Sequence, residues 1–492
     1  MPKKSEPDPG DRLPIKLGPT SNGEYFPTPL SAEIEHVQHE ALRRADRAAR
    51  RLGMARRDFL QSTSGAATVL LALNAAGCAG QAGAAPRGGR YAVPPEAEHE
   101  RAAADTVLAG DEFIFDVQTH HVSGERPWYE TPQPNLGMFL RTIPHAQCGA
   151  PRWVDCFTRD PFVKEVFFDS DTQLGVLSAL WGTHDINALS IEEAALTRER
   201  MAMVGAPRLR IHGIVLPRAE EGVELGDRMH DLAETWKVAA WKLYPVWGEN
   251  GHGYRLDDPA TGLAIIERGL ALGVPLFAVH KGLPLPGMDP AFTSPLDVGP
   301  AAKAFPRATF LIYHSGFEPD RREGPYDPNA QRGVDALIRS VEAQGIGKQG
   351  NVYAELGSLW REVMKDPEQA AHVIGKLLAH FGEDRILWGT DAIWYGSPQD
   401  QIQAFRAFEI SPEFQERYGY PALTREAKAK IFGLNAARVY GVDPDEIQSA
   451  RRWDPVRKAR NEYVPSPSFQ TYGPRTRREM LTLLRLNRGQ PG

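Results

Sequence analysis

The sequence has few cysteines and no strong excess of charge of one sign. Its 492 residues include three cysteines, Cys78, Cys148 and Cys156, too few for a metal finger or a disulfide framework. Cys148 and Cys156 could pair in an oxidising compartment, but we expect both to be free, buried thiols. The formal net charge is −6, whereas phosphate binding needs a concentrated positive field, so we expect no nucleic-acid partner.

The sequence also lacks an apolar run long enough to cross a bilayer as a stable anchor. A shorter apolar stretch of small residues, 65–77, follows the segment Ala55-Arg56-Arg57-Asp58-Phe59-Leu60-Gln61. The paired arginines, the Phe-Leu pair and the run after them resemble a twin-arginine export signal. We therefore expect an exported, periplasmic protein, with an ordinary first helix in a cytoplasmic protein as the alternative. Met54 is an alternative start of the chain, and lipidation of Cys78 is a less favoured option.

Composition divides the chain into four regions. Residues 1–53 are polar and lack a periodic apolar pattern, so we expect them to be disordered. Residues 54–90 would hold the export signal and a linker rich in alanine and glycine. Residues 106–445 would form the main domain. Residues 446–492 are a basic tail, which we expect to wrap across that domain or to contact a second copy in a homodimer.

From about Asp111 onward the chain repeats a short apolar run, a polar loop and an amphipathic helix. The runs are nearly continuous in Val, Ile, Leu and Phe, as in strands that are buried on both faces. They are residues 113–120, 174–181, 209–216, 238–244, 275–280, 309–314, 352–356 and 386–389. Eight such units predict an α/β fold, a (β/α)8 TIM barrel. A doubly wound open sheet is the alternative, but no glycine-rich phosphate loop follows the first run.

The helices between the runs carry start signals. Ser190 with Glu193 makes a capping box, and Asp258-Pro259 and Asp366-Pro367 each offer a cap followed by a first-turn proline.

Polar and titratable residues gather at the carboxyl ends of the predicted strands, where barrels place their active sites. Several of the 14 histidines are among them, although chance would scatter these residues along the chain. The residues at these ends are Gln118, His120, His184, Arg218, Lys242, His280, His314, Glu355 and Asp391. Converging nitrogen and oxygen ligands with a vacant position suit a hydrolytic metal, which lowers the pKa of bound water towards ~7.

Four motifs at these ends resemble the amidohydrolase superfamily. They are Phe115-Asp116-Val117-Gln118-Thr119-His120, Phe277-Ala278-Val279-His280, Tyr313-His314-Ser315-Gly316 and Arg385-Ile386-Leu387-Trp388-Gly389-Thr390-Asp391. More narrowly, they are similar to the branch that includes aminocarboxymuconate-semialdehyde decarboxylase and related aromatic-acid decarboxylases and lactone hydrolases. A closing helix beginning at Lys430 also resembles that branch. The resemblance covers about residues 111–443.

The resemblance implies a metal site and a catalytic pair. Gln118, His120, His280 and Asp391 would be the ligands of one divalent metal, with zinc expected first and manganese or iron as alternatives. His314 would be the catalytic base or acid, and Asp391 would also carry a proton. The family usually has His-x-His where this chain has Gln118-Thr119-His120, and a neutral amide oxygen suits zinc less well than imidazole. Weak metal binding, metal-free catalysis, or His121 as a substitute ligand after a bulge are therefore further options.

Other residues would hold a small-molecule substrate. We expect His184, Lys242, Glu355 and Trp394 to line its pocket, and the long segment 128–164 to form a lid. The expected reaction is metal-assisted hydrolysis of a C–O or C–N bond in a small carboxylated or cyclic substrate. Non-oxidative decarboxylation by the same residues is the alternative, with a carboxylate clamp from Arg126, Arg141, Arg152 or Arg159. A binding protein that has lost catalysis is the alternative from another class.

Overall fold

The computed structural model of the chain describes residues 13–78, 88–125, 128, 150, 152–182, 187–217, 224–247, 253–284, 289–450, 455–467, 471 and 473–487. Some residues singled out from the sequence lie outside these ranges. They are His184, expected in the substrate pocket, the clamp candidates Arg126 and Arg141, and also Cys148 and Arg218.

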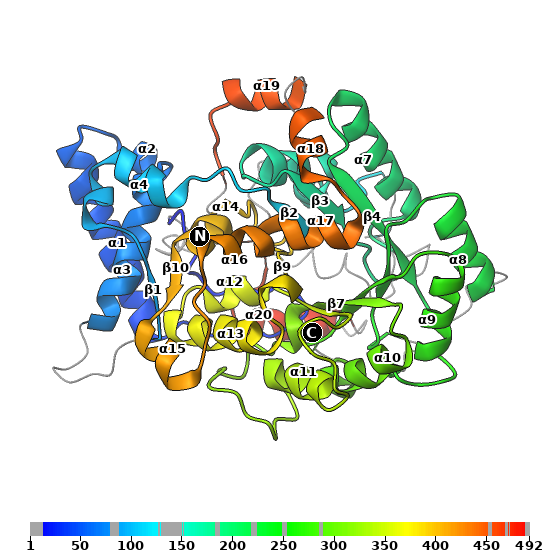
Figure 1. The fold of residues 1–492 in the computed structure, drawn as a ribbon. Helices are drawn as coiled ribbons and strands as arrows, with labels where there is room; N and C mark the ends of the chain where they lie inside the picture. The colour runs from blue at the N-terminus through cyan, green and yellow to red at the C-terminus, as the bar shows by residue number, and fades with distance from the viewer. Residues whose placement is uncertain are drawn as a thin grey trace.

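Eight parallel strands form a barrel with helices around it (Figure 1). They follow one another around the sheet in sequence order. The strands are β2 (Phe115–Thr119), β3 (Leu174–Leu177), β4 (Leu209–Val215), β5 (Ala240–Leu243), β6 (Leu276–His280), β7 (Thr309–Tyr313), β8 (Val352–Glu355) and β9 (Ile386–Leu387). Each lies within one of the eight predicted runs, so the predicted TIM barrel is confirmed.

The barrel closes between the end of β9 and the end of β2. The amide of Asp391 donates to the carbonyl of Gln118 at 2.9 Å, and the amide of His120 donates to the carbonyl of Ala392 at 2.6 Å. Thr119 and Ala392 also form a parallel bridge. The residues expected to carry the chemistry at these two strand ends are therefore tied together by backbone hydrogen bonds.

The strands are held by apolar residues on both faces. Phe115, Val117, Val176 and Leu311 belong to a cluster inside the barrel. Residues that point to the other face of a strand, such as Phe277, pack in the outer cluster with the helices. Alternation along a strand produces the two faces. Full burial of one large apolar side chain contributes about 1.5–3 kcal/mol, so the two layers fix the strand ends firmly.

Helices alternate with the strands. The main ones are α6 (Arg159–Val163), α7 (Ile191–Val204), α8 (Leu225–Glu234), α9 (Gly262–Ala271), α10 (Val298–Ala304), α11 (Gly333–Glu342), α12 (Leu359–Val363), α13 (Pro367–His380), α14 (Gln399–Ala407), α15 (Pro412–Tyr418), α16 (Arg425–Ala429) and α17 (Asn435–Tyr440). The hydroxyl of Ser190 caps α7 and the carboxylate of Asp366 caps α13, as predicted. The start predicted at Asp258 is wrong, because the helix begins at Gly262, with Thr261 as its N-cap residue.

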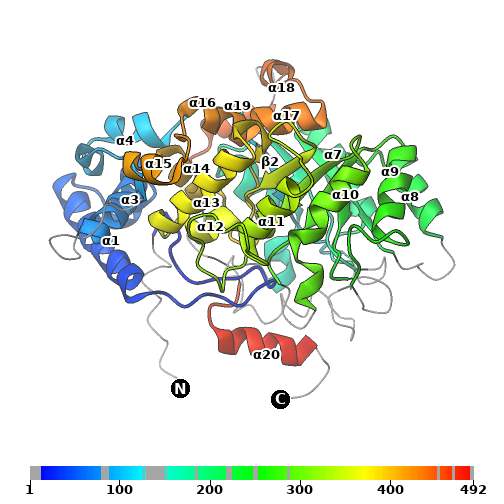
Figure 2. The same ribbon diagram turned by 60° about the horizontal axis from the view of Figure 1, so that its bottom comes forward.

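Part of the segment expected to be disordered is ordered and packed on the barrel. Leu13, Ile15, Leu17 and Tyr25 are buried, and α1 (Ala32–Arg51) buries a stripe of small residues. These residues are too sparse for a core of their own, and they are ordered by contacts with distant parts of the chain. We call residues 13–31 the N-terminal strap. Figure 2 shows it passing beneath the barrel beside α20 (Arg477–Asn487).

The apolar run expected to belong to an export signal is α3 (Thr63–Cys78), preceded by α2 (Arg56–Leu60). Val69, Leu70 and Leu73 are buried, and α3 lies against α1 and α4 (Arg101–Leu108). The antiparallel strands β1 (Gly89–Tyr91) and β10 (Phe408–Ile410) join this group to the barrel. No helix among the described residues is long and apolar enough to cross a membrane.

Two further expectations concern Cys156 and the basic tail. Cys156 is buried and disulfide-bonded, which corrects the expectation of free thiols. The tail contains α18 (Pro444–Ala450), α19 (Pro455–Glu462) and α20. Arg460 forms an ion pair with Asp171 at 2.9 Å, and Arg477 lies over the ring of Phe26. The described part of the tail therefore lies across the domain.

Candidate active site

His120, His280, His314 and Asp391 are all buried at the carboxyl ends of barrel strands. They form two groups, one around Asp391 and one between His280 and His314.

Both oxygens of Asp391 accept hydrogen bonds. Oδ1 lies 3.1 Å from His120 Nε2 and accepts from Gln118 Nε2 at 3.2 Å. Oδ2 accepts from Ser358 Oγ at 2.6 Å and from Asn22 Nδ2 at 2.7 Å. A carboxylate offers about four lone-pair sites, so these four contacts occupy Asp391 fully. Burial raises the pKa of Asp391, but the hydrogen bond and charge of His120 outweigh burial and hold it below its usual value.

His120 lies between two hydrogen-bond acceptors. Its Nδ1 faces the carbonyl of Ser178 at 3.1 Å, and its Nε2 faces the Asp391 carboxylate. Both ring nitrogens therefore face acceptors, which fixes the orientation of the ring between β3 and Asp391. The ring of Trp394, a predicted pocket residue, stacks on His120 with 5.6 Å between the centroids.

The rings of His280 and His314 lie 4.9 Å apart. His280 Nε2 donates to the carbonyl of Leu283 at 3.1 Å, and His314 Nδ1 donates to the carbonyl of Gly357 at 2.8 Å. Each ring therefore carries its proton on the nitrogen that faces a carbonyl. The other two nitrogens, His280 Nδ1 and His314 Nε2, are buried and have no hydrogen-bond partner. Burial lowers the pKa of both rings, that of His314 to about 4, so both are neutral at pH 7.

Glu24 of the N-terminal strap enters the site, and sequence reasoning missed it. Its Oε1 lies 3.7 Å from His280 Nδ1 and its Oε2 lies 3.7 Å from His314 Nε2. The Asn22 amide that donates to Asp391 also donates to Glu24 Oε2 at 2.7 Å. Burial, together with the charge of Asp391, raises the pKa of Glu24. The sequence signal that could have found the strap is the alternation of Leu13, Ile15 and Leu17, which is typical of an extended, half-buried segment.

One group of acidic and histidine residues within the described ranges could hold a metal ion. Glu24, His280 and His314 offer ligand atoms that lie within 4.8 Å of one another. The predicted ligand set was Gln118, His120, His280 and Asp391, and the structure gathers it differently. Gln118 and His120 each contact Asp391, whereas His280 faces His314 and Glu24.

Two of the predicted pocket residues lie in the same buried region. Lys242 Nζ has no hydrogen-bond partner and lies 3.8 Å from the centroid of the Tyr313 ring. Burial lowers the pKa of Lys242, although the charge of Glu24 opposes this. The carboxylate of Glu355 accepts from the backbone amides of His314 and Gly357, and burial raises its pKa to about 8. Glu355 thus holds the end of β7 in place.

The backbone is strained at the same strand ends. His314 has a φ of 65° and Asp391 a φ of 60°, and Ser315 and Ser358 also have positive φ. Residues other than glycine seldom adopt this region, and such residues cluster at functional sites.

Other candidates from the sequence lie away from these groups. His121 Nε2 bonds to Thr197 Oγ1 at 2.9 Å, so its ring does not replace Gln118. Arg152 pairs with Asp155, and Arg159 pairs with Glu193. Both arginines therefore pair with acidic residues of the chain itself.

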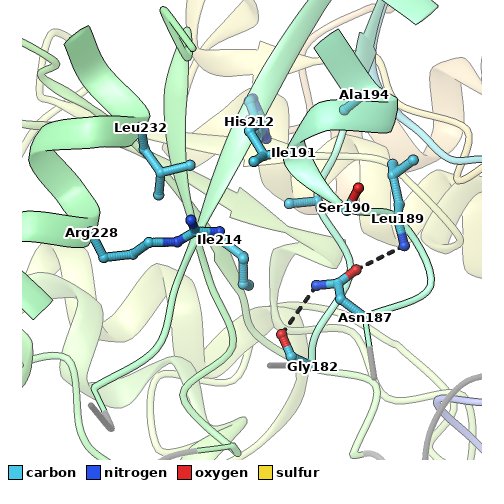
Figure 3. Close-up of a pocket in the computed structure, with 11 residues that line it drawn as sticks. Gly182, Asn187, Leu189, Ser190, Ile191, Ala194, His212, Ile214, Arg228 and Leu232 are labelled. Carbon is cyan, nitrogen blue, oxygen red and sulfur yellow. Dashed lines mark hydrogen bonds between the residues drawn. The ribbon is translucent and has the colours of Figure 1, made fainter. Parts of the chain in front are cut away.

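A pocket opens near the ends of β3 and β4 (Figure 3). Asn187 holds its rim by donating to the carbonyls of Leu180 and Gly182. His212 lines the pocket and faces Ser178 Oγ at 3.5 Å, so Ser178 connects the pocket with His120.

Comparisons with known proteins give a family match and distant structural similarities. The family model described as Amidohydrolase matches residues 173–442, more than half of the chain. The chain is similar to 5-carboxyvanillate decarboxylase from Sphingomonas paucimobilis, with 12% identity, a TM-score of 0.42, and coverage of 68% of this chain and 100% of that chain.

Two further solved structures show similarity of the same order. The 2,6-dihydroxybenzoate decarboxylase from Rhizobium has 14% identity and a TM-score of 0.38, with coverage of 67% of this chain and 99% of that chain. A candidate 2-pyrone-4,6-dicarboxylic acid hydrolase from Pseudomonas putida has 15% identity and a TM-score of 0.39, with coverage of 68% and 98%. No curated protein matches the chain significantly.

Proposed function

We propose, from the premise that this chain belongs to the amidohydrolase family, that it is a metal-assisted hydrolase of a C–O or C–N bond in a small carboxylated or cyclic substrate. The observation that carries the proposal is the pair of neutral imidazoles at the ends of β6 and β7. His280 Nδ1 and His314 Nε2 are buried without hydrogen-bond partners. An unsatisfied buried polar group costs about 1–3 kcal/mol, and a cation between the two rings would offset that cost for both.

The donors fit a divalent cation. Imidazole nitrogen suits zinc and several other transition metals, and a neighbouring carboxylate adds the charge that such ions prefer. A bound cation would lower the pKa of a water and polarise the substrate carbonyl. The predicted ligand Asp391 is the less favourable donor in this arrangement, because its oxygens already accept four hydrogen bonds.

The residues of the chain then divide the remaining work. His120, whose Nε2 faces Asp391 Oδ1, can pass a proton to the leaving group, and Asp391 holds the ring in position for the transfer. Lys242 Nζ is buried without a hydrogen-bond partner, so it can anchor a carboxylate of the substrate. In a reaction without metal, His314 Nε2 would be the base, as the family resemblance implies.

Decarboxylation is the second candidate, and Lys242 is the observation that favours it. A buried amino group without a hydrogen-bond partner fits a substrate whose carboxylate must enter a buried site. In that reaction the bond between carbon and the carboxyl group breaks and CO2 leaves. The electron pair stays on the carbon, which takes the proton of His120.

Isotope labelling distinguishes the two reactions. The full chain, loaded with Zn²⁺ or Mn²⁺, would be screened against lactones, amides and aromatic acids in water enriched in ¹⁸O and, separately, in D2O. Hydrolysis places ¹⁸O in the product carboxylate. Decarboxylation releases CO2 and places deuterium on the former carboxyl-bearing carbon. Turnover that is equal with and without bound metal would contradict the metal-assisted proposal.

Export through the twin-arginine segment is a separate proposal. Arg56 and Arg57 are exposed on α2 and could be recognised there, whereas the apolar residues after them are packed in α3. Cell fractionation with sequencing of the mature N-terminus tests it. A cytoplasmic location would contradict export. Cleavage after α3 would remove residues 13–31, the N-terminal strap, from the periplasmic chain.

A further inference from the structure

We propose that Glu24 of the N-terminal strap is the carboxylate ligand of a metal site with His280 and His314, so that a segment outside the barrel completes the active site. The inference rests on the proposed metal-assisted function and adds the identity and origin of the third ligand. The strap is fixed on the barrel, Glu24 is fixed within the strap, and the three ligand atoms have the spacing of a metal site.

Buried polar contacts fix the strap on the barrel. Lys16 forms an ion pair with Asp400 at 2.9 Å, and both side chains are almost fully buried. Arg361 Nη2 donates to the carbonyl of Gly18 at 3.1 Å. The hydroxyl of Tyr25 donates to Glu362 at 3.1 Å. These anchors lie on both sides of Glu24, so the segment that carries it is held at both ends.

A tight turn then orients Glu24 within the strap. Asn22 Oδ1 accepts from the backbone amide of Glu24 at 3.0 Å, and Ser21 Oγ accepts from the amide of Gly23 at 2.9 Å. Side chains of this kind stabilise turns by bonding the backbone two residues on. The amide nitrogen of Asn22 holds Glu24 Oε2 and Asp391 Oδ2 at 2.7 Å each. Glu24 is therefore aimed at the barrel end and not at solvent.

The distances between the Glu24 oxygens and the two histidine nitrogens, together with the directions of the ring N–H groups, favour a bound cation over direct hydrogen bonds. Both Glu24 oxygens lie 3.7 Å from a histidine nitrogen, too far for a hydrogen bond. The facing nitrogens carry lone pairs, because the ring protons are directed to carbonyls. Ligands ~2.0–2.1 Å from a tetrahedral zinc ion lie roughly 3.3–3.5 Å apart, close to the observed spacing. The spacing of these three ligand atoms therefore leaves room for a cation between them.

Glu24 also accounts for the altered first-strand motif. Gln118 stands where the family usually has a histidine ligand, and its amide nitrogen donates to Asp391. A carboxylate delivered from the strap restores three protein ligands without a contribution from β2. Three protein ligands with one open position are the usual set of a catalytic zinc site.

The test measures metal binding by the full-length chain. Bound metal would be removed from four proteins with a chelator: wild type, Glu24→Gln, His280→Asn and the control Glu35→Gln. Each protein would then be reloaded with Zn²⁺ and titrated against a competing chelator. Glu35 is exposed on α1, so its variant repeats the same chemical change away from the site. Visible absorption of the Co²⁺-loaded proteins reports the ligand set independently of activity. Melting of the metal-free proteins checks folding, which the isosteric Glu24→Gln change should leave intact.

We expect Glu24→Gln to weaken Zn²⁺ binding at least about tenfold and to change the Co²⁺ spectrum, while Glu35→Gln matches wild type. Loss of binding in His280→Asn with unchanged affinity and spectrum in Glu24→Gln would overturn the role of Glu24 and leave the proposed function standing. No metal binding by the wild-type chain would overturn both.

Discussion

Asn22 and Asp391 are separated by 369 positions in the sequence, yet the amide of Asn22 donates a 2.7 Å hydrogen bond to Asp391 Oδ2. The same nitrogen donates to Glu24 Oε2. One side chain of the strap thus connects the His120–Asp391 pair with the His280–His314 pair. The strap and the barrel end should therefore behave as one functional unit.

A chain that begins at Met54 should be both unstable and unable to bind metal. It would lack Glu24, the buried apolar residues of the strap, and Lys16, the ion-pair partner of Asp400. Breaking a buried ion pair by removing one partner costs about 3–5 kcal/mol. Thermal unfolding and elemental analysis of the two chains, purified in parallel, would show the difference. Equal melting temperatures and equal metal contents would mean that the strap is dispensable.

Lys16→Met should destabilise the full chain by about 3–5 kcal/mol, because Asp400 keeps its buried charge without a partner. The double variant Lys16→Met/Asp400→Leu removes both charges, and we expect it to recover most of that loss. Urea unfolding of the three proteins provides the measurement. A single variant as stable as wild type would show that this ion pair does not hold the strap.

Gln118→His should not raise the amount of bound metal. The oxygens of Asp391 already have four hydrogen-bond contacts, and both ring nitrogens of the nearby His120 already face acceptors, so a new histidine on β2 gains no partner ligand. Elemental analysis of the variant after reconstitution measures this. A chain that binds metal only as the Gln118→His variant would instead support the ligand set expected from the family resemblance.

The free energy of unfolding at acidic pH should depend on the ion pair of Asp171 and Arg406, whose Oδ2 and Nη1 atoms lie 2.6 Å apart. Burial raises the pKa of Asp171, but the charge of Arg406 outweighs burial and holds it below its usual value of 3.8. A depressed folded-state pKa stabilises the fold above the unfolded value, and this contribution is lost as pH falls through the folded pKa. Arg406→Met should therefore show a smaller fall in unfolding free energy between pH 6 and about pH 3 than wild type. Parallel pH dependences would contradict this assignment.

The sequence predicts the barrel well because the information is local. Eight apolar runs and the polar residues at their ends follow from strand burial, and His120, His280, His314 and Asp391 all lie where the pattern places them. Glu24 could not be found in this way. The strap has no core of its own, and residues such as Lys16 and Tyr25 are ordered only by partners hundreds of positions away.

The grouping of the site residues was also beyond the sequence. The motifs identify which residues reach the barrel end, but hydrogen bonds decide which of them remain available to a ligand. Asp391 is satisfied by Gln118, His120, Ser358 and Asn22, and two of these four donors come from outside the predicted site.

We infer that His280 and His314 hold a metal ion, a claim that elemental analysis of the purified full-length chain can check without a substrate. The wild-type chain should retain about one equivalent of a divalent metal after dialysis, and the double variant His280→Asn/His314→Asn should retain none. A wild-type chain without metal, even after reconstitution with Zn²⁺ or Mn²⁺, would contradict the claim.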